Sequence, residues 1–571
     1  MGRIIGTQDS TPLEFWVLLD KGEAVQVDEA VVVKTESPIG PLKLFGMVDI
    51  IRAKHQGSTF DSDVVEAERG LPVELSVAAH VKVTRLDPEY YYPPLPGDPV
   101  HVVTGEEYAR ALFMDKMERK FPLGLSLSRK EVVYGNLDFL NGRKGAHINI
   151  SGVSGIATKT TYTTFLLHSL LHCNALNDPA NTHAIIFNVK GEDLLFLDKK
   201  NNTLTPQDLA EYEKLGLPSD PFDSVQFYVP PTEAPRGPLM PRVGSRRADE
   251  VTAYFWTVRS FCHDKLLRYL FADAGEDSSL LSTLVYQVER RLSEAAEEAD
   301  KKGPGPGVFL RIEKKKSKSE KSDEAEESAE VEEREIRDFF ALMKAIESIA
   351  ESTGQAAGTV GAFMRRLYGL EDKISYIIRD PGDAESSQHL INWRNSQVTV
   401  VSLTGLYEVG KSFVVGSVLQ QIQREKEATG SAEPLCFIVV DELNRYAPRD
   451  GWSPIRDRLL EIAERGRSSG TILIGAQQTA SEVERRIVAN PAFRIVGRLD
   501  AAEAERAEYG FLPPTLRQRA TILTSGRMIV SQPDIPTPVP VCFPMPAWAT
   551  RAEEQELPPP NLKLVKTRRN S

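Results

Sequence analysis

Short apolar runs alternate with helical patterns in two separated parts of the chain. An apolar run that is bounded by turns and followed by an amphipathic helix is typical of a buried parallel strand. The runs cover residues 147–151, 182–188, 397–403, 435–440, 471–476 and 493–499. This alternation predicts an α/β fold whose core, built from residues 106–193 and 391–535, contains a parallel sheet of about six strands covered on both faces.

Residues 1–105 follow a different pattern. Short runs rich in β-branched and aromatic residues are separated by turn residues, for example at 14–19, 30–34, 45–51 and 75–83. Spacing of this kind predicts a small N-terminal β-barrel or sandwich.

The segment 194–390 is mainly helical and polar in pattern, which predicts a helical insertion between the two parts of the core. Inside it, residues 303–335 form a low-complexity tract that opens with alternating Gly and Pro and continues with a basic and then an acidic block. Neighbouring charge blocks of this kind are usually disordered or solvated helix, so we expect no ordered core in 303–335.

The C-terminal segment 536–571 follows a stretch in which proline recurs at every second or third position. Proline lacks the N–H that a helix interior or a central strand requires. We therefore expect an extended brace across a neighbouring surface, ending in a basic, poorly ordered tail.

Composition bounds the class of protein. The 571 residues are 41% hydrophobic and 26% charged, with a net charge of −12. No apolar run approaches the roughly 18–20 residues that a membrane span needs. Four scattered cysteines form neither a metal pair nor a disulfide framework, so we expect a cytoplasmic protein without a membrane partner. Because the chain is acidic, any DNA-binding surface must be local, such as the lining of a pore.

A loop of small residues follows the run 147–151. In such a loop, backbone N–H groups and a helix N-terminus bind phosphates, a lysine reaches the β/γ-phosphates and a hydroxyl ligates Mg²⁺. Thr158 replaces the usual glycine and the spacing is one residue too long, so the loop alone leaves a nucleotide site and an ordinary turn both open. The nucleotide-binding candidates are Gly152, Ser154, Gly155, Ala157, Thr158, Lys159, Thr160 and Thr161.

The apolar run 435–440 ends in two acids, Asp441 and Glu442. An Asp at the carboxyl end of a buried strand can hold Mg²⁺, and an adjacent Glu can polarise the attacking water. The alternative is a buried strand that meets solvent in two acids. With a phosphate loop upstream, the pair favours a catalytic site.

A second loop, Gly405-Leu-Tyr-Glu-Val-Gly-Lys-Ser412, matches the phosphate-loop pattern letter for letter. Glu408 would place a carboxylate among the phosphates, where like charges repel. Bulky side chains would also hinder the close backbone approach that glycine permits. We interpret 405–412 as a strand-to-helix turn.

Two further elements suit ATP chemistry. The run 471–476 ends in Gln477 and Gln478, and an amide at that position can sense a γ-phosphate. A helix end carries Arg465 and Arg467, and an arginine offered to a neighbouring subunit would act as an arginine finger. A surface amide and cations favoured at a helix C-terminus are the plain alternatives.

The ordered set of elements resembles the HerA family of the FtsK–HerA ATPase superfamily over nearly the whole chain. The resemblance is carried by the β-rich N-terminus and by Gly152–Thr160, Val440-Asp-Glu442, Glu464-Arg-Gly-Arg467 and Ala476-Gln-Gln-Thr-Ala-Ser-Glu-Val483. It implies a RecA-like P-loop core, a hexameric ring with ATP sites between subunits and a channel for double-stranded DNA.

The resemblance also implies ATP and Mg²⁺ as cofactors. It assigns phosphate and Mg²⁺ binding to Lys159 and Thr160, Mg²⁺ support to Asp441, the catalytic base to Glu442, the polar sensor to Gln478, and the trans finger to Arg467 with Arg465 as a second candidate. Lys190, at the end of the run 182–188, is a candidate DNA contact.

The implied partners are a NurA-like nuclease in DNA-end processing, or a sirtuin-type or other effector in anti-phage defence. Three hypotheses stay open: a DNA translocase or helicase, a slow ATP-binding ring that scaffolds an effector, and an ATP-dependent enzyme that uses the 405–412 loop.

Overall fold

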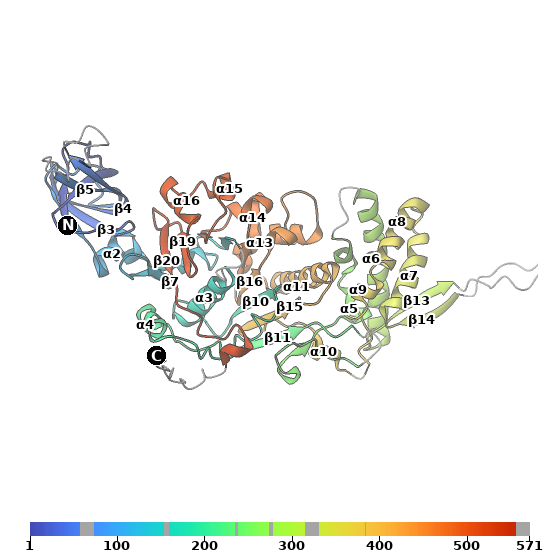
Figure 1. Ribbon diagram of the computed structural model, residues 1–571. Coiled ribbons are helices and arrows are strands. Elements are labelled where there is room, and N and C mark those ends of the chain that lie inside the picture. The colour runs from blue at the N-terminus through green and yellow to red at the C-terminus, as the bar shows by residue number, and fades with distance from the viewer. Residues whose placement is uncertain are drawn as a thin grey trace, which may run out of the picture.

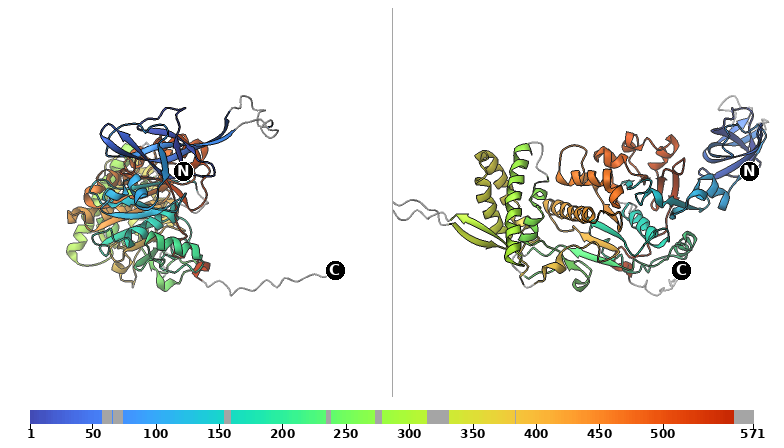
Figure 2. Two further views of the ribbon diagram at one scale, coloured as in Figure 1. Left: turned by 90° about the vertical axis from the view of Figure 1, so that its left-hand side faces the viewer. Right: turned by 180° about the vertical axis from the view of Figure 1, so that it is seen from behind.

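The computed structural model describes residues 1–56, 65, 74–153, 159–233, 238–272, 278–313, 331–382 and 384–555. A small barrel lies at one end, a sheet-based core in the middle and a group of helices at the other end (Figure 1). Seen from behind, the barrel and the helices again lie on opposite sides of the core (Figure 2). No helix within the described ranges is long and apolar enough to cross a membrane.

The N-terminal domain is a closed barrel with the strand order β1-β2-β5-β4-β3-β6, which confirms the predicted small barrel. Alternate residues of β2, such as Phe15 and Val17, are buried in its interior, as the period of a strand requires. Its strands are β1 Gly2–Ile4, β2 Glu14–Leu19, β3 Ala30–Ser37, β4 Gly40–Gln56, β5 Glu74–Asp87 and β6 Pro99–Val102.

The core contains one large mixed sheet, and all six predicted runs form neighbouring parallel strands within it. Their order is β15-β10-β16-β17-β9-β18, so the two separated parts of the chain interleave. The strands are β9 Ile148–Ser151, β10 Thr182–Asn188, β15 Val398–Ser402, β16 Leu435–Val440, β17 Thr471–Gln477 and β18 Phe493–Val496. The predicted α/β class and parallel core are thereby confirmed.

Helices cover both faces of this sheet. Ile185 and Phe187 of β10 belong to one core cluster, and the alternating Ala184 and Ile186 belong to the other. Helix α3 (Lys159–His172) packs in the second cluster, whereas α11 (Glu408–Thr429) and α13 (Pro454–Ser469) pack in the first. Shorter helices around the core are α2 Gly105–Ala111, α4 Pro206–Leu215, α12 Leu443–Tyr446, α14 Arg485–Ala489, α15 Ala501–Ala504 and α16 Pro514–Ala520.

The segment 194–390 is not only a helical insertion. Strands β11 (Val225–Val229) and β12 (Thr252–Ala253) extend the parallel sheet beyond β15, because β11 pairs with β15 in register. These strands are short, and polar loops flank them, so the helical pattern around them dominated the prediction. The helices that follow are α5 Val258–His263, α6 Ser278–Lys302, α7 Phe339–Glu351, α8 Ala357–Tyr368, α9 Glu371–Ile374 and α10 Ser386–His389.

The tract 303–335 is also more ordered than predicted. Strand β13 (Val308–Glu313) lies near the start of the tract and β14 (Val331–Ile336) at its end, and the two strands pair antiparallel. Val308 and Ile336 are fully buried against the helices of the insertion, which explains why these ends are ordered despite the charge. The middle of the tract, 314–330, lies outside the described residues.

The prediction that the Pro-rich C-terminal stretch cannot supply a central strand is wrong. Strand β20 (Val539–Cys542) pairs with β19 (Arg527–Ser531) on one side and with β7 (Lys120–Ser126) on the other, and β8 (Val132–Asn136) closes that edge. Pairing with β7 begins at Val541, so the missing N–H of Pro540 interrupts no bond on that side.

After β20 the chain crosses its own core. The side chain of Trp548 is fully buried, and backbone N–H groups of Asn201 and Ala549 donate to the carbonyls of Ala547 and Lys199. The brace therefore packs against its own chain as far as residue 555. The tail from 556 onward lies outside the described residues.

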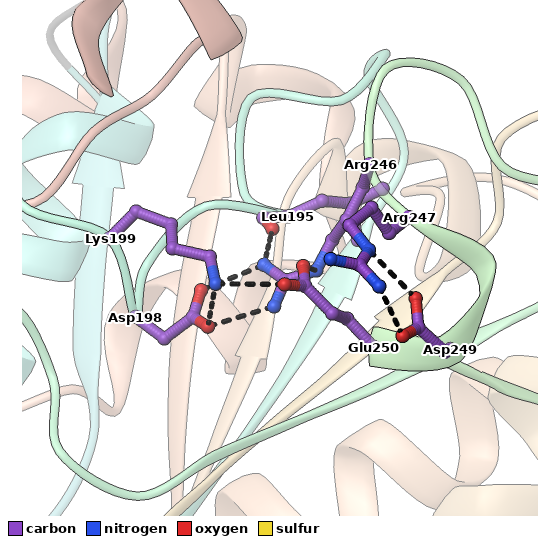
Figure 3. A network of polar contacts seen from close by, with 7 residues as sticks. All are labelled: Leu195, Asp198, Lys199, Arg246, Arg247, Asp249 and Glu250. Atoms are coloured by element: carbon purple, nitrogen blue, oxygen red, sulfur yellow. Dashed lines mark hydrogen bonds and ion pairs between the residues drawn. The ribbon is translucent and has the colours of Figure 1, made fainter. Parts of the chain in front are cut away.

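A polar network fixes the base of the insertion (Figure 3). The buried Arg246 guanidinium donates two hydrogen bonds to Asp198, of 2.7 and 2.8 Å, and forms an ion pair with Glu250 at 3.2 Å. It also lies 4.0 Å above the Phe227 ring. Such bidentate, stacked geometry is specific to arginine. The network holds the loop after β10 against β11.

Candidate functional site

The loop from β9 to α3 lies at the carboxyl edge of the sheet, near its centre. The N–H groups of Gly152 and Val153 donate to the carbonyls of Gln477 and Arg498, at 3.1 and 2.8 Å, which fixes where the chain leaves β9. Four predicted nucleotide-binding residues, Ser154, Gly155, Ala157 and Thr158, lie outside the described residues. Helix α3 then begins at Lys159, so its N-terminal end points out of this edge.

Lys159 is a buried cation. The residue is only 4% exposed, and its Nζ donates to the carbonyl of Gly152 at 2.6 Å. Burial lowers the pKa of Lys159 to about 8, opposed by the Asp441 carboxylate and assisted by the nearby Lys190. A phosphate group bound here would relieve that burial cost, since it supplies the opposite charge.

Thr160, in the first turn of α3, and Asp441, at the end of β16, lie side by side. The Thr160 hydroxyl donates to Asp441 Oδ2 at 3.2 Å, although the two residues are 281 positions apart. Asp441 follows β16 directly and is largely buried. A hydroxyl and a carboxylate at this separation are the hard oxygen ligands that Mg²⁺ prefers, so the residues fit a Mg²⁺–phosphate group. Thr161, beside them, is half-buried.

Glu442 adopts a left-handed backbone conformation, with φ of 53°. Its N–H donates to Asp441 Oδ1 at 2.8 Å, and the turn leads directly into α12. A non-glycine residue in this region is under mild strain, which is often found where a side chain must be aimed. The Glu442 carboxylate faces two cations, Lys190 at 3.6 Å and Arg445 at 3.5 Å.

Lys190 lies beside Asp441 and Glu442. Its Nζ is 3.4 Å from Asp441 Oδ2 as well as 3.6 Å from Glu442 Oε1. The sequence placed it correctly at the carboxyl end of β10 but suggested a DNA contact. In the structure its ion pairs join it to Asp441 and Glu442, and the DNA contact stays a prediction.

The two glutamines at the end of β17 differ. Gln477 is fully buried, and its Nε2 donates to Asn149 Oδ1 and Ser151 Oγ, each at 2.8 Å. It therefore joins β17 to the end of β9. Gln478, the predicted sensor, is exposed one residue beyond the strand, at the same edge as Asp441.

The two arginines lie elsewhere. Arg467 lies in the last turn of α13, just before β17, and β17 spans 7 residues, a length of roughly 20 Å. Arg467 is therefore at the opposite edge of the sheet from Lys159. Its Nε donates to the carbonyl of Gly142 at 2.9 Å, and its Nη2 donates to that of Arg143. Arg465 is 80% exposed, with Glu461 3.9 Å away.

Arg467 lines a cavity of about 290 Å³. Two further arginines, Arg119 and Arg143, line it, together with Asn141 and Ser468. Sequence reasoning missed Arg119 and Arg143, because the first is far from any motif and the second lies in an unremarkable polar loop. Three arginines therefore line this cavity, but Asp178 and Glu433 line it as well, and Arg119 pairs with Asp138, so its charge is mixed.

The 405–412 segment is a strand-to-helix turn, as interpreted from the sequence. Strand β15 ends at Ser402 and α11 begins at Glu408, so few residues remain for a loop around phosphates. Lys411 lies in the first turn of the helix, and its Nζ pairs with Glu408 Oε1 at 2.9 Å. The Arg242 guanidinium donates to the carbonyl of Gly405.

Comparisons with known proteins give a general likeness only. No protein-family model matches the sequence, and no curated protein matches it. Among solved structures, VirB4 of Thermoanaerobacter pseudethanolicus aligns with a TM-score of 0.45 and 14% identity, covering 77% of this chain and 99% of that one. Plasmid coupling protein TrwB in complex with ADP and Mg²⁺ aligns with a TM-score of 0.45 and 11% identity, covering 79% and 94%. At such values we draw the function from the site itself.

Proposed function

We propose that this protein is a Mg²⁺-dependent ATPase of the HerA type that moves double-stranded DNA. The observation that carries the proposal is the convergence of four side chains at the carboxyl ends of β9 and β16: Lys159, Thr160, Asp441 and Glu442. They combine a buried cation at a helix N-terminus, a hydroxyl–carboxylate pair and a second acid. Few sites other than those of nucleoside triphosphates need all of these at once.

The roles follow from position. Lys159 binds the β/γ-phosphates, while Thr160 and Asp441 hold the metal ion. Mg²⁺, when bound, supplies neutralising charge to the phosphates. Glu442 takes a proton from the attacking water, because it is the acid next to the metal site that carries no hydrogen bond to Thr160. Gln478 lies at the same carboxyl edge of the sheet as Asp441, which is the position needed to contact the terminal phosphate.

Assembly of several copies of the chain into a ring would explain where the arginines lie. Arg467 and Arg143 lie at the opposite edge of the sheet from their own phosphate loop, so they suit a neighbour's nucleotide. We propose a homohexamer with ATP sites at the seams and DNA in the centre. Such DNA contacts are directed at phosphates and independent of sequence.

The partner is proposed to be a NurA-like nuclease, or a defence effector such as a sirtuin-type NADase. The paired state of Glu442 favours a second candidate function, a slow ATP-binding ring that scaffolds and regulates such an effector. In both cases the protein acts in the cytoplasm, and the two differ in the rate of turnover with DNA.

Replacing Lys159 should weaken nucleotide binding. In Lys159→Ala the loss of a charge-assisted bond, worth about 1.5–3 kcal/mol, predicts roughly 10- to 150-fold weaker binding of a fluorescent ADP analogue with Mg²⁺. Lys411→Ala is the matched control, since Lys411 occupies the same place in the second loop but pairs with Glu408. If Lys411→Ala abolishes binding and Lys159→Ala does not, the nucleotide site is at 405–412.

The proposed function is tested by steady-state ATP hydrolysis with and without linear duplex DNA. A motor that grips phosphates should turn over faster with DNA, and this stimulation should weaken as salt rises from about 50 to 200 mM. Turnover that DNA does not change would contradict the translocase and favour the scaffold.

A further inference from the structure

One arginine is shared by two carboxylates at the edge of the nucleotide site. Arg445 Nη1 lies 3.5 Å from Glu442 Oε2 and 3.1 Å from Glu408 Oε2. Glu442 is the proposed base, whereas Glu408 opens α11 on another part of the sheet edge. The 405–408 turn and the catalytic acid are therefore linked through a single guanidinium.

Each oxygen of the Glu442 carboxylate faces a cation. Lys190 lies near Oε1 and Arg445 near Oε2. A carboxylate that is held at both oxygens is fixed in orientation, so it is less free to turn toward the attacking water. This arrangement restrains the base.

Glu408 is well placed to compete for Arg445. It is 57% exposed on its side chain, and Arg445 is 41% exposed, so both can move without unpacking a core. Lys411 holds the other Glu408 oxygen at 2.9 Å, and Arg242 holds the turn through the carbonyl of Gly405. A shift of this turn would change how closely Glu408 approaches Arg445.

We propose that Arg445 is a positioning residue whose charge is divided between Glu442 and Glu408, so that the 405–408 turn sets how freely Glu442 acts as a base. The proposal rests on the proposed ATPase function. It gives the segment that resembles a second phosphate loop a regulatory role. Movement of Glu408 toward Arg445 frees Glu442, and movement away restrains it.

The rate of ATP hydrolysis without DNA tests whether Glu442 and Glu408 share Arg445. Arg445→Gln should raise it about two- to fivefold, in line with the small worth of part-exposed ion pairs, and Glu408→Gln should lower it to a similar extent. In the Arg445→Gln background, Glu408→Gln should have no further effect, and Arg445→Lys should stay near wild type. The matched control is Arg424→Gln, which breaks the comparably exposed ion pair between Arg424 of α11 and Asp264 at the end of α5.

Two other readouts separate this role from a structural one. Binding of a non-hydrolysable ATP analogue should be unchanged in all of these variants. In the nucleotide-free protein, hydrogen–deuterium exchange should rise in both 403–411 and 441–447 when Arg445 is replaced. Additive effects of the two substitutions on turnover, or exchange that rises in 441–447 alone, would overturn the proposal. If wild-type turnover is absent altogether, the ATPase function fails, and the exchange result still decides whether Arg445 is shared.

Discussion

Glu442→Gln should lower ATP turnover by about 10²- to 10⁴-fold, the usual contribution of a general base, and leave nucleotide binding close to wild type. Glutamine has nearly the same shape but cannot accept the proton from water. Glu442 is partly exposed and lies beside Asp441, at the start of α12, so the substitution disturbs little packing. Single-turnover hydrolysis with saturating Mg²⁺–ATP measures the effect.

The neighbouring acid supplies the comparison. Asp441→Asn should weaken Mg²⁺-dependent binding itself, because Asp441 Oδ2 meets the Thr160 hydroxyl where the metal ion is expected. Glu427→Gln, on an exposed part of α11, controls for loss of one negative charge. If Glu442→Gln loses Mg²⁺–nucleotide binding as severely as Asp441→Asn, then Glu442 is a metal ligand and not the base.

The central fold could be predicted from the sequence because its signal is local. Each buried parallel strand is a short continuous apolar run, and six such runs marked six neighbouring strands. The N-terminal barrel carries the equally local alternation of β2 and its neighbours. The prediction failed where the local signal was weak or misleading. Strand β11 is short and lies among polar loops. Strand β20 contains Pro540, which the sheet tolerates because pairing with β7 begins at the next residue.

The candidate site was predicted in part for the same reason. Asp441 and Glu442 follow β16 directly, and Lys159 and Thr160 begin the helix after β9, so the two strand ends placed them at one edge. The ion pairs that these acids form could not be predicted, because they join distant parts of the chain. Lys190 and Asp441, for example, are 251 positions apart.

The arginine cluster shows a similar limit, since Arg143 becomes relevant only when the chain folds its loop against Arg467, 324 residues later. No pattern of spacing links two loops at the same edge of a sheet. The structure also separates the two arginines of α13, which the sequence could not. Arg467 is anchored to two carbonyls, whereas Arg465 is 80% exposed.

Arg467→Ala should lower turnover more than any other single substitution, by about 10³- to 10⁵-fold, if Arg467 is an arginine finger. The guanidinium would stabilise charge that develops in the transition state, so binding of ATP should change little. Arg465→Ala, two residues away, is the matched control and should have a small effect. Steady-state hydrolysis measures both.

Mixing variants then tests whether the arginine acts between subunits. Lys159→Ala lacks a nucleotide site but keeps its arginine, and Arg467→Ala has the reverse defect. In mixed rings, some seams would combine an intact Lys159 with a neighbour's intact Arg467, so activity should exceed the sum of the two separate variants. Such recovery requires the arginine to come from another copy, because within one chain it lies across the sheet from the phosphate loop. Arg467→Ala with wild-type turnover, or a defect that mixing does not relieve, would contradict the trans role and leave the cavity beside Arg143 without a function in ATP hydrolysis.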